Sequence, residues 1–248
     1  MKTKYREDHL SCEQSAVSAL SMDEPKALLR RFSTLERSSG KADERTAAQY
    51  IVERLTHFGV DHQVYEPTLL ISLPVESTLE YPANGGWRGL QCACPSFSAA
   101  TDPDWVEADA VLARTTARSG VNLFDKTVLG PGIAVEGKIA MVEAAFAPGL
   151  VEALSRLGAV GVVMINPGRH IHESNCSTIW GAPGLDNVHR LPKVPVVSIN
   201  RPDAERLIEK SERSGLRLRL KTKMDTGWVR CLIPVAEIKG VDEPGKFV

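Results

Sequence analysis

Two stretches decide the fold of this 248-residue chain: GKIAMVEAA at residues 137–145 and LSRLGAVGVVMIN at residues 154–166. Each contains a short apolar run that is typical of a buried strand. Between them, Leu150 and Leu154 repeat at a helical interval, and Gly158 marks the end of that helix. The order strand, helix, strand predicts an α/β unit.

The same unit extends in both directions along the chain. ADAVLA at residues 108–113 and VPVVSIN at residues 194–200 are further short apolar strands. Residues 201–214 have the pattern of an amphipathic helix, with a proline near the start and a glycine directly after the end. Residues 216–224, LRLRLKTKM, alternate as an exposed or half-buried strand does. Residues 105–227 are therefore predicted to be β-rich with two helices.

The N-terminal part of the chain has its own pattern. Residues 43–58, DERTAAQYIVERLTHF, place apolar side chains at three- and four-residue intervals, and Gly59 ends this predicted helix. Residues 60–74 alternate and are rich in β-forming side chains, which predicts a strand. Residues 1–22 show no sustained period and are interpreted as a loose lead-in.

The remaining segments are predicted to be connections and strands. Residues 81–104 are rich in Gly, Pro, Ser and Ala, which is typical of a linker, and Trp87 and Trp105 are expected to anchor it. Residues 229–240 are expected to add one more strand. Another strand is predicted to begin at residues 246–248, where the sequence stops.

Composition and charge exclude several classes of partner. The formal net charge is -1, so no overall field would attract nucleic acid or an anionic membrane. The alternating basic residues of LRLRLKTK lack interleaved aromatic residues and are interpreted as a solvated sheet face. Residues 1–15 lack the apolar core of a secretion signal, and no run approaches the roughly 20 apolar residues of a membrane span. We therefore expect a cytoplasmic protein with reduced thiols at its five cysteines.

One polar cluster contains residue types that bind zinc. His170, His172, Glu173 and Cys176 lie within HIHESNCSTIW, and an extended segment would place the two histidines on one side. Their spacing matches neither a metalloprotease helix nor a zinc finger, which favours a loop with hydrogen-bonded or solvated histidines. Cys92 and Cys94 likewise lack a second ligand pair and are interpreted as buried or idle thiols.

Signature motifs of catalysis are missing from the sequence. It contains no nucleophile elbow, no P-loop and no dinucleotide-binding glycine pattern. Nothing in one sequence shows which Ser, His and acidic residues converge. No catalytic, cofactor-binding or metal-binding residue is therefore assigned, and enzyme activity is left open.

Several segments together resemble one family, the zinc-dependent aminopeptidases and their glutamate carboxypeptidase relatives that carry an inserted protease-associated domain. Residues 38–61 resemble the opening helix of the family, and residues 65–74 resemble the strand after it. Residues 137–144 and 154–166 resemble a strand, helix and strand of the inserted domain. The most specific match is IHESNCSTIWGAPGLDNVHRLPKVPVVSIN at residues 171–200, which is similar to a loop of that domain.

The resemblance implies a fold and a division of the chain. The fold is a β-rich protease-associated domain with two flanking helices, inserted in the incomplete N-terminal part of an α/β zinc-peptidase domain. The implied segments are a lead-in at 1–22, an N-terminal peptidase part at 23–80, a linker at 81–104, the protease-associated domain at 105–227 and a return strand at 228–248.

The resemblance also implies a function. In the family, the strand after the return strand delivers a His-x-Asp motif with the first zinc ligands. No residue here matches a metal ligand or the general base, so the chain is interpreted as an N-terminal peptidase fragment that is inactive alone and holds no cofactor. A peptide or protein partner of the inserted domain is expected, together with self-association of the incomplete sheet. The alternatives are a stand-alone peptide-binding module and a small metal-binding protein using the His170–Cys176 cluster.

Overall fold

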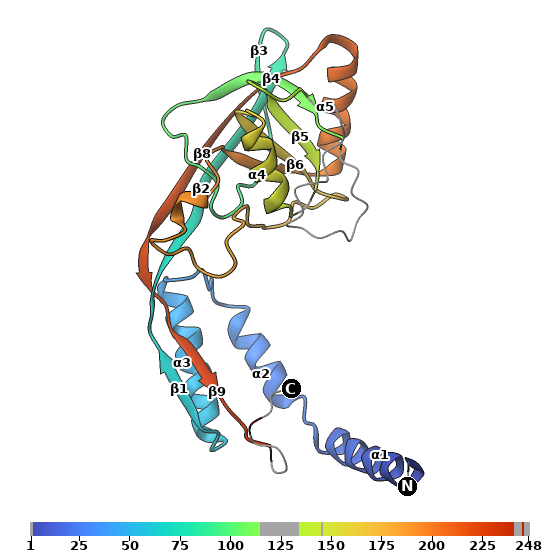
Figure 1. The fold of residues 1–248 in the computed structure, drawn as a ribbon, viewed down its shortest axis with the longest axis vertical. Helices are drawn as coiled ribbons and strands as arrows, with labels where there is room; N and C mark the ends of the chain where they lie inside the picture. The colour runs from blue at the N-terminus through green and yellow to red at the C-terminus, as the bar shows by residue number, and fades with distance from the viewer. Residues whose placement is uncertain (1, 115–133, 145, 241–244, 246–248) are drawn as a thin grey trace. The chain divides into compact units, whose positions relative to one another are not determined.

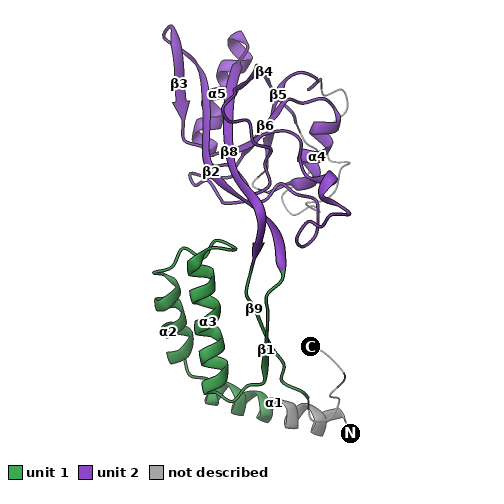
Figure 2. Ribbon diagram, turned by 90° about the vertical axis from the view of Figure 1, so that its left-hand side faces the viewer, with its two compact units in different colours: residues 1–67, 231–248 green, residues 68–230 purple. Residues whose placement is uncertain are grey.

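The chain folds into two units in the computed structural model, which describes residues 2–114, 134–144, 146–240 and 245 (Figure 1). One unit comprises Met1–Pro67 with Cys231–Val248, and the other comprises Thr68–Arg230 (Figure 2). The strand expected at residues 246–248 lies outside the described residues. Within that described part, no helix is both long enough and apolar enough to span a bilayer.

Unit 1 contains three helices and a pair of strands among its described residues. They are α1 (Lys2–Ala19), α2 (Asp23–Phe32), α3 (Ala42–His57), β1 (His62–Tyr65) and β9 (Ile233–Ala236). Helix α3 confirms the helix predicted at 43–58, and the strand predicted at 60–74 is divided at Glu66 and Pro67. Helix α1 replaces the expected loose lead-in. The side chains of residues 10–19 are all exposed, so this part of the helix buries no apolar stripe, and its sequence has no helical period to detect.

The packing within unit 1 relies on a few specific contacts. Arg54 of α3 makes an ion pair with Glu24 of α2 at 2.7 Å. The rings of Phe32 and Tyr50 meet edge-on with centroids 6.1 Å apart. The buried residues of α3 are two alanines, Ala47 and Ala48. Unit 1 therefore has a small core.

Unit 2 is a mixed α/β fold around one sheet. Its described strands form a seven-stranded sheet in the order β3-β2-β8-β4-β5-β6-β7. Strands β4 to β7 run parallel to one another, whereas β3, β2, β8 and β4 pair antiparallel. The elements are β2 (Thr68–Ala83), β3 (Gly86–Leu90), β4 (Val106–Leu112), β5 (Ile139–Glu143), α4 (Pro148–Arg156), β6 (Gly161–Ile165), the 3-10 turn η1 (Val188–Arg190), β7 (Val196–Ile199), α5 (Arg201–Ser214) and β8 (Arg217–Arg230).

The sheet has an apolar cluster on each face, which explains the continuous apolar runs of the parallel strands. Ile139 and Met141 of β5 belong to the cluster that includes Leu207 of α5. Ala140 and Val142, which alternate with them, belong to the cluster that includes residues of α4. The predicted strand, helix, strand order and the predicted helix at 201–214 are confirmed.

The unit boundaries differ from the segments expected from the sequence. Residues 68–80 lie in unit 2, because β2 pairs with β8 from Thr68 to Glu80. The expected linker also begins with structure, since the end of β2 and β3 form a hairpin. Asn84 and Gly85 form its turn with φ of 50° and 83°, the positive values that a two-residue hairpin turn requires.

The basic face of β8 is paired with acidic side chains. Arg219 makes a hydrogen bond to Glu80 at 2.6 Å, and its guanidinium lies 4.5 Å from the ring centre of Trp87 and 4.4 Å from that of Trp105. The two predicted anchors therefore hold the same arginine. The neighbouring pairs are Arg217 with Glu107 and Asp109, and Lys221 with Asp102.

Candidate functional site

The crossover at residues 166–195, which joins β6 to β7, is the candidate functional site. It contains the predicted polar cluster and begins at the carboxyl end of a parallel strand. In open α/β sheets, ligands bind at the carboxyl ends of the strands, where crossover loops supply side chains. All residues of this site lie in unit 2.

Buried hydrogen bonds fix the first half of the crossover. Asn166 has no exposed surface; its backbone N–H donates to the Ile199 carbonyl at 2.8 Å, and its Oδ1 accepts from the His172 N–H at 2.7 Å. Ser96 donates its N–H to the Ser174 carbonyl at 2.9 Å and accepts from the Cys176 N–H at 3.1 Å. The crossover is therefore tied both to the end of β7 and to the segment before β4.

The structure does not assemble the zinc cluster considered from the sequence. His170, His172 and Glu173 are exposed, whereas Cys176 is 1% exposed and donates to the Ser96 carbonyl at 3.2 Å. No group of three His, Cys, Asp or Glu side chains that could hold a metal occurs among the residues that the structure describes. The described part of the chain therefore does not fit a zinc site.

The cysteines of this region are buried thiols. Burial raises the pKa of Cys94 to about 11, and burial also raises the pKa of Cys176 well above its ordinary value. A thiolate is the form that attacks electrophiles and binds metals. Both side chains are therefore neutral at pH 7 and serve as small core residues.

The outer part of the crossover presents two large apolar side chains. Trp180 is 88% exposed and Leu185 is 85% exposed. Between and beside them, Ile179 and Pro183 are buried, and the Ile179 N–H donates to Ser177 Oγ at 3.1 Å. The anchored backbone therefore presents both side chains to solvent. Aromatic side chains are enriched in binding interfaces.

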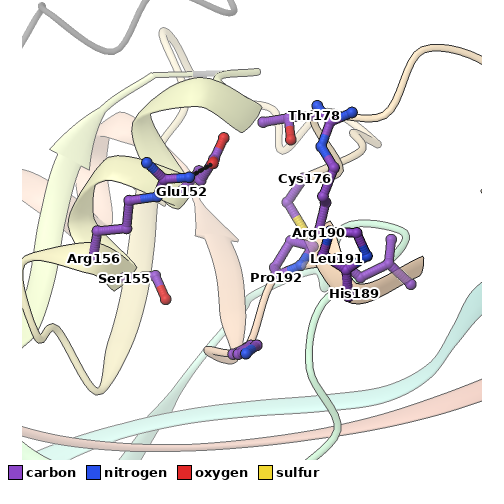
Figure 3. A pocket seen from close by; sticks show the side chains of 10 residues that line it. Glu152, Ser155, Arg156, Cys176, Thr178, His189, Arg190, Leu191 and Pro192 are labelled. Carbon is purple, nitrogen blue, oxygen red and sulfur yellow. Dashed lines mark hydrogen bonds and ion pairs between the residues drawn. The ribbon is translucent and has the colours of Figure 1, made fainter. Parts of the chain in front are cut away.

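A cavity of about 570 Å³ lies between α4 and the second half of the crossover. Figure 3 shows Glu152 and Arg156 of α4 on one side and His189 and Arg190 on the other. Arg156 makes an ion pair with Glu152 at 2.6 Å. The lining residues are Glu152, Ser155, Arg156, Cys176, Thr178, His189, Arg190, Leu191, Pro192 and Lys193.

Sequence analysis did not single out most of the cavity residues. Cys176 belonged to the predicted cluster. The lining residues from 176 to 193 all lie within the segment 171–200 that resembles a family loop, but apart from Cys176 only Leu191 and Pro192 formed part of a pattern noted there. The basic residues at 189, 190 and 193 surround that Leu-Pro pair, and this local pattern could have indicated a charged rim. Their proximity to α4 could not be predicted, because it depends on how the crossover folds back.

Comparison with known proteins shows which solved structures have a similar fold. No protein-family model matches the sequence, and no curated protein matches it. Solved structures do match. An aminopeptidase from Aneurinibacillus sp. strain AM-1 has a TM-score of 0.58 at 14% identity, over 88% of this chain and 49% of that one.

Two further structures give the same result. For BSAP, a zinc aminopeptidase from Bacillus subtilis, the TM-score is 0.52 at 19% identity, over 86% of this chain and 47% of that one. For a peptidase M28 precursor from Shewanella amazonensis SB2B, the TM-score is 0.59 at 17% identity, over 90% of this chain and 52% of that one. The chain therefore spans about half the length of these proteins, and its fold is similar to that of the corresponding part of a zinc aminopeptidase.

Proposed function

We propose that this polypeptide is the N-terminal, non-catalytic part of an M28-type zinc aminopeptidase, and that unit 2 is its protease-associated domain. One observation carries the proposal: the likeness to two aminopeptidase structures and an M28 peptidase structure extends over 86–90% of this chain and therefore includes residues of both units. The order of the sequence segments that resemble the family supports the same assignment.

In this proposal, the crossover at 166–195 contacts the substrate peptide. The support is the exposure of Trp180 and Leu185 on an anchored loop, since an aromatic side chain contributes a large contact area at low entropic cost. Peptide binding to the purified chain can be followed by isothermal titration, whose signal does not depend on Trp180, with short peptides that have a free N-terminus as probes.

The matched control for this test is a second exposed tryptophan. Trp180→Ala is expected to weaken peptide binding about tenfold, whereas Trp228→Phe, in β8, is expected to leave it unchanged. Trp228 is 48% exposed. Equal binding by the Trp180→Ala variant, or no saturable peptide response of the unsubstituted chain, would contradict the assigned role.

We also propose that residues 1–248 do not hydrolyse peptides alone. The segments that resemble the family do not include its metal-binding motif, and hydrolysis in such enzymes needs a metal-activated water and a carboxylate base. The test is turnover of aminoacyl p-nitroanilides by the purified chain with added zinc. Turnover that a chelator abolishes would refute this part of the proposal.

Self-association through unit 1 is the expected partner interaction. Tyr65, Ile233 and Val235 lie on one face of the β1–β9 pair and are 52%, 41% and 45% exposed. Apolar faces on open sheets promote pairing with a second chain. Sedimentation should detect a concentration-dependent dimer that Ile233→Lys weakens. A dilute and a concentrated sample that sediment alike would exclude it.

A further inference from the structure

The cavity beside α4 has an uneven distribution of charge. The Arg156 charge is compensated by its ion pair with Glu152, which is the one acidic side chain among the described lining residues. Arg190 lies on the opposite side of the cavity (Figure 3), and Lys193 also lines it. Both are exposed, and neither forms an ion pair among the described residues, so two positive charges are available to a ligand.

Neutral polar groups complete the lining. Thr178 Oγ1 is buried and has no hydrogen-bond partner among the described residues, although a buried hydroxyl without a partner is costly. The Ser155 hydroxyl lies on the α4 side. The Cys176 thiol adds no negative charge, because burial raises its pKa.

We propose that this cavity binds a carboxylate group. Its volume of about 570 Å³ lies within the range of roughly 300–1,000 Å³ that is typical of small-ligand sites. The guanidinium of Arg190 can donate two parallel hydrogen bonds to a carboxylate, Lys193 adds a second charge, and Thr178 adds a hydroxyl donor. Glu152 on the facing side disfavours a phosphate dianion more than a carboxylate.

The carboxylate can belong to an acidic side chain of a peptide or to a free organic acid. This inference goes beyond the proposed function and does not depend on it, since the cavity is lined by residues other than Trp180 and Leu185. A variant that loses carboxylate binding but still binds peptide at Trp180 would separate the two proposals. A variant that loses peptide binding but still binds the carboxylate would separate them equally.

The experiment is isothermal titration of the purified chain with matched probes. These are N-acetyl-Ala-Glu-Ala-amide, its glutamine counterpart, free glutarate and inorganic phosphate. Binding of the glutamate peptide or of glutarate is expected, at least tenfold tighter than binding of the glutamine peptide or phosphate. Whether the glutamate peptide or glutarate binds more tightly identifies the source of the carboxylate.

Three substitutions on different residues test the assignment. Arg190→Gln and Lys193→Gln are each expected to weaken carboxylate binding about tenfold, and Thr178→Val about threefold. Arg213→Gln, an exposed arginine of α5, is the control and should bind like the unsubstituted chain. No saturable binding up to about 10 mM, equal affinity for the glutamine peptide, or unchanged binding by both Arg190→Gln and Lys193→Gln would overturn the proposal.

Discussion

Arg219 holds three separate segments of unit 2 together, so its replacement tests the packing directly. Its guanidinium lies between the rings of Trp87 and Trp105 at 4.5 and 4.4 Å. It also donates to Glu80 at 2.6 Å. The two side chains of this ion pair are only 26% and 19% exposed. Water therefore screens the pair less than an exposed one.

The expected cost of Arg219→Ala follows from these contacts. Each cation–π contact contributes about 0.5–1 kcal/mol. Loss of the ion pair and of the partner for the half-buried Glu80 carboxylate adds about 1–2 kcal/mol. The free energy of unfolding should fall by about 2–4 kcal/mol, and Tm by roughly 5–10 °C for a unit of this size. Arg219→Lys keeps the charge but not the planar stacking, so about half of this loss is expected.

The sequence offers a selective assay. All four tryptophans of the chain lie within Thr68–Arg230, so urea unfolding followed by tryptophan fluorescence reports on unit 2 alone. Arg213→Ala is the matched control and should change stability by less than about 0.5 kcal/mol. The stacking argument would be refuted by an Arg219→Ala variant as stable as this control, or by an Arg219→Lys variant destabilised as much as Arg219→Ala.

Three further predictions concern the core, the thiols and unit 1. Leu154→Ala removes a side chain of α4 that has no exposed surface and should lower the free energy of unfolding by about 2–5 kcal/mol in the same urea assay; a loss below about 1 kcal/mol would contradict the packing. Because burial raises the folded-state pKa of Cys94 to about 11, its neutral form is favoured by folding. Stability should be full below about pH 9 and decline toward pH 11, with a smaller decline in Cys94→Ala. Amide hydrogen exchange should be faster in α3 than in β5, since the largest fully buried side chains lie in unit 2; equal protection would rule this out.

Local periodicity was sufficient to predict the elements that bury an apolar face. The helix at 201–214 appears with the predicted limits, and Asn200 caps it by accepting from the Asp203 N–H at 2.8 Å. The runs that became β5 and β6 are continuously apolar because helices cover both faces of the sheet. These features follow from side chains that are neighbours in the sequence.

Other features could not be predicted in this way. The turn at Asn84-Gly85 had a recognisable hairpin signal, but the surrounding Pro and Gly residues favoured a linker. Helix α1 has no apolar stripe to detect. The sequence also gave no reason for Cys176 to turn away from the neighbouring histidines and into the core.

The sequence by itself determined both helices of unit 2 and its strands other than β3, and it indicated a resemblance to aminopeptidases. The tertiary structure alone decided that residues 68–80 belong to unit 2, that Trp87 and Trp105 share Arg219, and that Arg190 faces α4 across a cavity. The physical reason is that periodicity records which side of an element is buried. It contains no information about which distant element covers that side.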